Sequence, residues 1–465
     1  MIRKIGIYFG AALVVLTILF FIATDSIDST PYFESNYFKT SCARIDSLKK
    51  NTEITTDSIQ AGFSRVSITP TLNSAEDNFA EGKFKQIPLA GFGARKGKAA
   101  TGIHDSIFVR AVALKTNKQT MVFVGADLLI MPPNIIDSVT SVLLRKGIHR
   151  NQLYFSATHT HSSVGAWGPG FIGEQFSGKE NINLEKWLVQ QISKAVISAL
   201  ADLRPALIGS GDFDAGIYTH NRVIGELGTK NNDFSFISIE QIGHRKAIMG
   251  SFSAHSTTMG SGNMEVSADY PGYWERKMEK TFNLAVFYAG SVGSQSPSGT
   301  GEGFDRPQNI GESLADSLNI YLPKTTLSDK PAFSAMTLKM QLPAYHFRLT
   351  TKLNLSSALS KKLMPFPENV YLQAVRIGNM VWISAPADFS GEYALQIKNA
   401  LASKGFHANV TSFNGNYVGY IVPGRYYYMD EYESKLMGWF GPNMGEYTMD
   451  LIRQISKIVT NTENL

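Results

Sequence analysis

The sequence predicts an α/β fold in which mixed β-sheets are flanked by helices. Apolar runs of strand length alternate with amphipathic helical patterns, and this alternation is typical of the α/β class. Residues 121–126 form a nearly continuous apolar run of the kind found in buried strands, and residues 184–203 carry the periodicity of a long amphipathic helix. Strand-like residues 370–376 and 380–384 flank a Gly378-Asn379 turn, which predicts a β-hairpin.

The other expected elements continue the same alternation. They are a strand over 107–114, a helix over 133–145, strands over 153–157, 247–254 and 284–288, a helix over 392–402 and a strand over 410–413. The helix over 133–145 begins with a proline in its first turn and has Gly147 beyond its end, where these two residues are favoured.

The N-terminus predicts a signal anchor. Arg3 and Lys4 precede an apolar run over residues 5–23, which as a helix of roughly 28 Å is long enough to cross a bilayer core. The run ends without a good signal-peptidase site. We therefore expect a transmembrane helix over residues 1–24, with the rest of the chain on the outer face of the membrane. The alternative is a cleaved signal peptide and a secreted domain.

Composition limits the remaining organisation. Residues 25–60 are rich in Ser, Thr, Asp and Asn and are expected to form a polar linker, followed by a single catalytic domain over residues 61–465. The net charge of +5 comes from scattered basic residues and gives no case for nucleic acid. Because Cys42 is the only cysteine, a metal site must use His, carboxylate or Tyr ligands.

A His-x-His pair follows the strand predicted over 153–157. Side chains of a strand alternate with period two, so His159 and His161 would point the same way. Two such imidazoles can bind a metal, or one can bind while the other handles a proton. A hydrogen-bonded histidine pair without chemistry is the alternative.

Other candidate ligands also follow predicted strands. His255, Asp388 and Tyr420 each lie at or beyond a strand end, and ligands of open α/β sheets collect outside the carboxyl ends of strands. Two histidines and one carboxylate are a common catalytic zinc set that leaves a position for water or substrate. The Gly/Ser loop over residues 290–297 either brings a serine and backbone N–H donors to a reacting carbonyl or forms a plain turn.

Several short segments, in this order and spacing, resemble the neutral/alkaline non-lysosomal ceramidase family, whose members hydrolyse the amide of ceramide to sphingosine and a fatty acid. The resemblance runs from about Ala61 to Ile458. Its segments are 62–70, 102–105, 158–162, 221–222, 254–259 with 267–269, 293–297, 416–420, and 431–433 leading to 440–442.

The resemblance implies a role for each matching residue. His159, His255 and Tyr420 match zinc ligands, and Asp388 stands where the family usually has a glutamate ligand. His161, Arg222 and Tyr432 match residues that hold the substrate amide and its developing oxyanion, and Ser296 matches the serine assigned as nucleophile. Either zinc-bound hydroxide attacks while Ser296 binds a substrate hydroxyl, or Ser296 itself attacks. We favour the zinc–water route, because three ligands and an open position already explain activation.

The chain departs from the family pattern near the site. Asp388 is one methylene shorter than glutamate, Ser294 replaces an aspartate, and Ser298 replaces an asparagine. The family's C-terminal β-sandwich domain is expected to be absent. These departures favour an altered substrate and weaken Asp388 most as a ligand.

The expected function is a zinc-dependent amidase that acts on ceramide or a related N-acyl lipid. The alternatives are a zinc hydrolase for a different amide or ester, and a catalytically silent binding homologue. The expected partners are the lipid substrate and a membrane reached through the N-terminal helix. The sequence carries no signal for an oligomeric state.

Overall fold

The chain folds as a mixed α/β protein, as predicted. The computed structural model describes residues 2–366 and 369–462. Its larger sheet has eight strands in the order β12-β10-β9-β7-β2-β4-β5-β6, of which the β10–β12 and β5–β6 pairs are parallel and the others antiparallel. These strands are β2 (Gln60–Ser67), β4 (Phe108–Lys115), β5 (Thr120–Ala126), β6 (Leu153–Ala157), β7 (Arg204–Asp214), β9 (Asp233–Gln241), β10 (Lys246–Phe252) and β12 (Leu284–Ala289).

A second sheet has four strands in the order β14-β16-β17-β19. These strands are β14 (Phe333–Met340), β16 (Val370–Ile377), β17 (Met380–Ser384) and β19 (His407–Thr411). The predicted hairpin joins β16 to β17 with Ile377 opposite Met380, and Gly378 adopts the positive φ of 63° that this tight turn requires.

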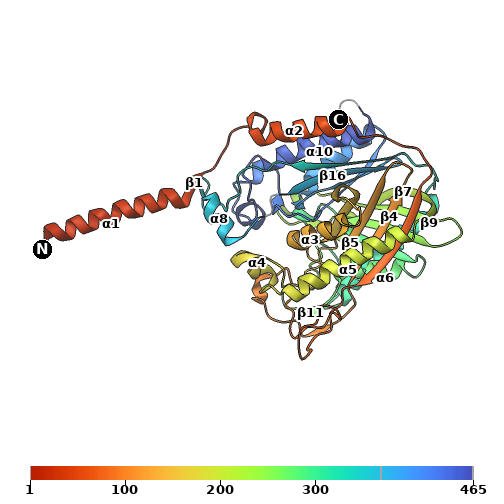
Figure 1. The fold of residues 1–465 in the computed structure, drawn as a ribbon, viewed down its shortest axis with the longest axis horizontal. Helices are drawn as coiled ribbons and strands as arrows, with labels where there is room; N and C mark the ends of the chain where they lie inside the picture. Colours follow the sequence, from red (N-terminus) through yellow and green to blue (C-terminus); the bar gives the residue numbers. More distant parts are fainter. Residues whose placement is uncertain (1, 367–368, 463–465) are drawn as a thin grey trace.

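The two sheets pack face to face inside helical outer layers (Figure 1). Phe123 and Tyr154 from the larger sheet meet Trp382 from the smaller one in a fully buried core. The other face of the larger sheet is covered by α3 (Pro133–Leu144), α5 (Ile182–Ala201), α6 (Asp269–Met278) and α7 (Asp305–Tyr321). The smaller sheet packs against α9 (Gly391–Ala402) and α10 (Met444–Thr460).

Residues 25–60 differ from the expected polar linker. They include α2 (Asn36–Lys49), which packs on β14 and α10 and buries Ile45. The hydroxyls of Ser41 and Tyr447 lie 2.7 Å apart, which joins α2 to the end of the chain. The apolar side chains of α2 recur with helical spacing and form one face of the helix. Because the segment around them is polar on average, its composition did not predict this helix.

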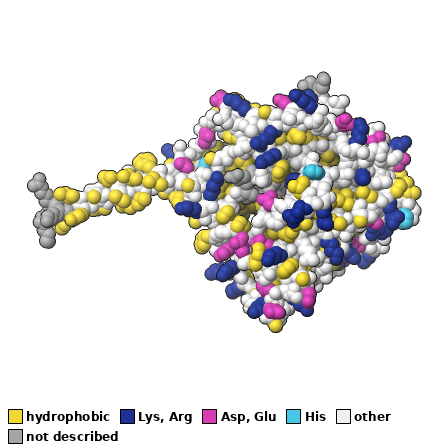
Figure 2. All heavy atoms as spheres, viewed as in Figure 1, with side chains coloured by type: hydrophobic (Ala, Val, Ile, Leu, Met, Phe, Trp, Pro, Cys, Tyr) yellow, Lys and Arg dark blue, Asp and Glu magenta, His cyan; other side chains and the backbone are white. Residues whose placement is uncertain are grey.

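The helix α1 (Ile2–Ala23) covers the predicted apolar run and extends away from the body of the molecule (Figure 1). Its side chains from Ile7 to Ile22 are exposed, and Figure 2 shows them as a continuous apolar surface. Among the residues that the structure describes, no helix has the length and apolarity that crossing a membrane requires. The transmembrane helix expected over residues 1–24 is therefore not supported.

Two short two-stranded pieces position the loops above the sheets. One pairs β8 (Thr219–Asn221) with β13 (Gln295–Pro297), antiparallel. The other pairs β18 (Asp388–Phe389) with β20 (Tyr420–Ile421), parallel. Each piece joins segments that are far apart in the sequence, and each contributes residues to the candidate site.

Candidate metal centre

The structure brings His159, His255, Asp388 and Tyr420 together from four separate segments. Asp388 Oδ1 lies 3.4 Å from His159 Nε2 and 3.3 Å from His255 Nε2. Tyr420 Oη lies 3.1 Å from His255 Nε2. All four residues are buried. Two imidazole nitrogens, a carboxylate oxygen and a phenol oxygen therefore face a common point.

Backbone carbonyls orient both of these imidazoles. The distance from Nδ1 to a carbonyl oxygen is 2.7 Å for His159 with Leu129, and 3.1 Å for His255 with Gln295. With the proton placed on Nδ1, each ring donates to its carbonyl and directs the Nε2 lone pair at the common point. Metal-binding histidines are usually held by such a bond on the other ring nitrogen.

Burial keeps these imidazoles neutral. It lowers the pKa of His159 to about 3, with further lowering by His255 and Arg222 and an opposing effect from the Asp388 carboxylate. Burial also lowers the pKa of His161 and of His255 well below the ordinary value. Neutral imidazole is the form that binds a metal.

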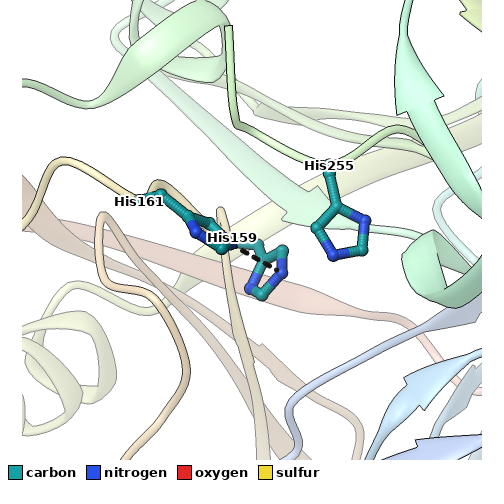
Figure 3. A group of neighbouring side chains, drawn as sticks. All are labelled: His159, His161 and His255. Carbon is teal, nitrogen blue, oxygen red and sulfur yellow. Dashed lines mark hydrogen bonds between the residues drawn. The ribbon is translucent and has the colours of Figure 1, made fainter. Parts of the chain in front are cut away.

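His161 lies beside His159, but strand alternation is not the reason. β6 ends at Ala157, and His159 adopts a left-handed backbone with φ of 62°. The two Nε2 atoms are nevertheless 3.3 Å apart (Figure 3). With His255 the pair forms a cluster in which one ring nitrogen from each residue lies within 4.8 Å of the others.

The wall behind His161 requires glycine. Gly91 has φ of 111°, and a Cβ at this position would lie 2.6 Å from His161 Nδ1. The Phe92 ring lies on the same imidazole, with ring centroids 4.7 Å apart. Backbone and aromatic contacts thus fix where His161 stands at the edge of the cluster.

Asp388 is buried and oriented by a tyrosine. Tyr417 Oη donates to Asp388 Oδ2 at 2.7 Å, whereas Asp388 Oδ1 has no hydrogen-bond partner among the described residues. Burial raises the pKa of the Asp388 carboxyl, and His159, Tyr417 and Arg222 oppose that rise. An orphaned, buried carboxylate oxygen that faces two imidazole nitrogens is the atom that a cation would satisfy.

The donor set therefore fits a divalent cation of the zinc type. Zinc is bound in proteins by imidazole nitrogen and carboxylate oxygen, usually with four ligands. His159, His255, Asp388 and Tyr420 supply two nitrogens and two oxygens. His161 is near enough to be a further ligand, or to face a molecule bound at the centre.

Arg222 links the centre to the chain's later segments. Its Nη2 donates to Tyr420 Oη at 2.9 Å, and its Nε forms an ion pair with Glu433 Oε1 at 2.8 Å. Glu433 is 6% exposed. Tyr432 is 41% exposed and sets its ring 5.8 Å from the Tyr420 ring, centroid to centroid.

Ser296 lies next to the centre without joining it. It belongs to β13, directly after Gln295, whose carbonyl holds His255. Among the described residues, the Ser296 hydroxyl makes no hydrogen bond to the histidine cluster. A Cβ at Gly293, on the loop before β13, would lie 2.5 Å from the Asp388 carbonyl oxygen, so glycine allows this loop to reach the metal-type ligands.

An apolar cavity of about 370 Å³ opens beside the centre. His159, His161, Asp388, Tyr420 and Tyr432 line its polar end. The rest of its wall is mostly hydrophobic and includes Leu129, Ile130, Trp167, Phe176, Phe366 and Trp439. The arrangement presents polar groups at one end of a site suited to hydrocarbon.

Two residues near the centre were missed from the sequence. Glu433 lies in a segment already singled out for its neighbour Tyr432, and Tyr417 lies three residues before Tyr420. Glu433 contacts Arg222 and Tyr417 contacts Asp388, and each partner lies in a distant segment of the chain. Residue spacing in the sequence therefore could not indicate either role.

The fold and the site together define a mixed α/β protein with a metal-type centre beside an apolar cavity. Residues 79–223 match the family model described as neutral/alkaline non-lysosomal ceramidase, N-terminal. This match agrees with the resemblance that the sequence carries.

Sequence and structure comparisons agree with the family. The neutral ceramidase of Pseudomonas aeruginosa is 24% identical over 246 residues, which cover 46% of this chain and 35% of that relative. The aligned part thus spans about a third of the relative's length. The crystal structure of neutral ceramidase from Pseudomonas aeruginosa shares the fold, with a TM-score of 0.73 at 18% identity over 88% of this chain and 75% of that one. A ceramidase structure described as complexed with C2 matches equally, at a TM-score of 0.73 and 18% identity, over 88% of this chain and 77% of that one.

Proposed function

We propose that this protein is a zinc-dependent amidase that hydrolyses the N-acyl bond of ceramide or a related N-acyl lipid to a free amine and a fatty acid. The observation that carries the proposal is the His–Asp–Tyr centre at the polar end of an apolar cavity. The ceramidase family match supports the reaction class.

His159, His255, Asp388 and Tyr420 would hold the zinc ion. When bound there, zinc supplies Lewis acidity that favours attack on the amide carbonyl. The four side chains contribute by holding fixed positions, because carbonyls orient both imidazoles and Tyr417 orients the carboxylate.

The remaining polar groups handle the amide. His161 is neutral, so one of its ring nitrogens can accept a proton while the other donates a hydrogen bond. A residue that passes a proton to the leaving amine needs this property. Arg222 brings fixed positive charge toward the oxygen that becomes negative during attack, and Tyr432 adds a phenol donor at the cavity wall. Ser296 binds a substrate hydroxyl or attacks the carbonyl itself.

The apolar wall of the cavity takes the acyl chain. Burial of hydrocarbon is worth about 0.8 kcal/mol per methylene group, so several methylenes that leave water here dominate substrate affinity. This accounts for a lipid amide rather than a small polar amide.

The first test is fatty-acid release from a panel of N-acyl lipids, together with zinc content. Wild-type protein should contain zinc and cleave at least one lipid amide, and His159→Ala should lose both properties. His149→Ala, which changes an exposed histidine, should retain both. Wild-type protein that contains no zinc after purification with the metal present would refute the proposal.

Asp388, Ser294 and Ser298 favour a second candidate function, a zinc hydrolase that acts on a different amide or ester. Asp388 lies at the centre, and Ser294 and Ser298 lie on either side of β13, where these departures from the family pattern would act on substrate choice. Zinc binding with cleavage of a different amide or ester, and no cleavage of ceramide, would select this function.

The location of the domain stays a prediction from the basic residues before the apolar N-terminal run. Protease treatment of cells stripped of any outer membrane tests it, because a domain exported to the periplasmic or extracellular face is digested and a cytoplasmic domain is protected.

A further inference from the structure

The ribbon of β8 and β13 lies beside the candidate centre, and apart from Ser296 its polar face has no role in the proposed reaction. In this antiparallel pair, Ser296 stands directly opposite His220. Residues in such a pair share one face of the ribbon. The carbonyl oxygen of the preceding residue, Gln295, accepts a hydrogen bond from His255, a candidate metal ligand. This face of the ribbon therefore lies directly beside the metal-type centre.

The two faces of the ribbon differ in character. On one face, Gln295 Nε2 donates to Thr219 Oγ1 at 3.1 Å and to the Asn231 carbonyl at 3.0 Å within a buried network. On the other face, Ser298 Oγ lies 2.9 Å from His220 Nδ1. His220 is exposed, and both serines on this face are partly exposed. The second face is therefore open to a ligand.

Two cations lie at the end of the ribbon where Pro297 pairs with Thr219. Arg306, in the first turn of α7, donates from Nη2 to the Pro297 carbonyl at 3.2 Å. Lys230 donates from Nζ to the carbonyls of Thr219 at 3.1 Å and Gly216 at 2.8 Å. Within the described part of the chain, these side chains bond to neutral carbonyls and form no ion pair with a carboxylate. Their charge is therefore left to act on the face.

The lowered pKa of His220 is a second indication that positive charge acts on the open face. Burial lowers the pKa of His220, and the charges of Arg306, Lys230 and Arg222 lower it further. Arg222 forms an ion pair with Glu433. The other two cations have no such partner, so their field reaches the open face.

We propose that the open face of the β8–β13 ribbon is an anion-binding subsite for the polar head of the substrate. It would hold a phosphate, sulfonate or carboxylate group attached to the amine half of an N-acyl lipid. The inference rests on the proposed function, since the acyl chain occupies the apolar cavity and the amine half then lies toward Ser296. Charge-assisted hydrogen bonds from Arg306 and Lys230, together with the serine hydroxyls of the same face, suit an oxyanion.

The test compares soluble amides that differ only in the head. N-dodecanoylethanolamine, its O-phosphate ester and N-dodecanoyltaurine present a neutral, a phosphate and a sulfonate head on the same acyl chain. Wild-type protein should favour an anionic head over the neutral one by about tenfold in kcat/KM, which corresponds to one charge-assisted hydrogen bond. The phosphate and sulfonate arms identify which anion the subsite takes.

Substitutions assign the preference to the ribbon. Arg306→Gln and Lys230→Gln should each lower the ratio of kcat/KM for the anionic over the neutral amide, whereas Arg306→Lys should keep most of it. Lys280→Gln removes an exposed lysine outside the ribbon and should leave the ratio unchanged. Melting temperatures show whether each variant is folded.

A binding readout separates the subsite from the reaction. Calorimetry with chelator-treated protein should show that the phosphate ester binds more tightly than the neutral amide, and that Arg306→Gln removes the difference. Equal kcat/KM and equal binding for neutral and anionic heads would overturn the subsite while amide hydrolysis stands. Head-dependent binding without cleavage of any amide would support the subsite and refute the proposed reaction.

Discussion

At the scale of single residues, Glu433 is the side chain whose role depends most on geometry. Its carboxylate is buried and lies 2.8 Å from Arg222 Nε, while Arg222 Nη2 donates to Tyr420. The ion pair fixes the plane of the guanidinium, because a carboxylate and a guanidinium prefer a planar arrangement. We interpret Glu433 as a positioning residue that acts through Arg222.

This interpretation predicts the effect of Glu433→Gln. The variant should lower kcat by about tenfold or more, since removing one preorganised donor to a developing oxyanion costs on the order of 10²–10³. Zinc content and KM should change little, because the ligands and the cavity are intact. Steady-state kinetics with metal analysis measures this. Glu431→Gln, which changes an exposed neighbour, is the control. Loss of zinc with unchanged kcat in the loaded protein would contradict the interpretation.

The site shows what single-residue reasoning from sequence achieves. His159, His255, Asp388 and Tyr420 were named because they follow strand ends and because they match ligand positions of the family that the sequence resembles. The structure places Asp388 Oδ1 3.4 Å from His159 Nε2 and 3.3 Å from His255 Nε2, and Tyr420 Oη 3.1 Å from His255 Nε2. Glu433 and Tyr417 were missed, because each is defined by a partner from a remote segment. The short side chain of Asp388 reaches the centre in a strand that pairs with the Tyr420 strand, a contact no local pattern encodes.

At the scale of elements, the glycine loop before β13 decides how closely the chain approaches the centre. A Cβ at Gly293 would lie 2.5 Å from the Asp388 carbonyl oxygen and 2.8 Å from its carbonyl carbon. Backbone atoms cannot move aside as the end of a flexible side chain can. Any side chain at this position must push the loop and the Asp388 strand apart.

Gly293→Ala should therefore weaken zinc binding and lower the melting temperature. The expected destabilisation is about 1–3 kcal/mol, typical of overpacking in a well-packed region. A competition assay with a chromogenic chelator measures zinc affinity, and calorimetry measures melting. Gly262→Ala adds a methyl group where no atom lies within 4 Å and should change neither property. Wild-type zinc affinity in Gly293→Ala would show that the loop does not support the ligands.

Elements with strong local patterns were predicted well, and elements made by distant pairing were not. The apolar run of β6 and the hairpin of β16 and β17 appear where the sequence places them. The two-residue strands β18 and β20 exist only because they pair with each other, so no periodicity precedes them. α2 was not predicted, because it lies in a polar segment and its few apolar residues are buried only by packing against α10 and β14.

At the scale of the whole molecule, the buried histidines make stability depend on pH. Burial holds the pKa of His159 to about 3, and the pKa values of His161 and His255 also lie well below the ordinary 6.5. Between these low values and 6.5, the unfolded chain binds protons that the folded chain does not. Stability therefore rises with pH in this window and falls as the pH drops below 6.5.

In metal-free protein, the contribution of these histidines to the melting temperature should accordingly fall as the pH drops from about 7 toward 4. The raised pKa values of Asp388 and of other buried carboxyls, Asp137, Asp269 and Glu275 among them, act in the opposite direction. The histidine contribution is therefore read from the difference between wild type and a histidine variant. Calorimetry across this range measures the slope. His159→Asn should reduce the slope in proportion to one lost group, and an unchanged slope would mean that His159 titrates alike in the folded and unfolded chains.

The whole molecule places the metal-type centre where the sheet edges, the ribbon of β8 and β13 and the apolar cavity meet. The central claim is that this centre uses zinc to hydrolyse a lipid amide. The most direct measurement is fatty-acid release from N-acyl lipid by one preparation before chelation, after chelation and after zinc is restored. The account predicts that release is lost on chelation and returns with zinc. Full release from protein shown by metal analysis to be zinc-free would contradict it.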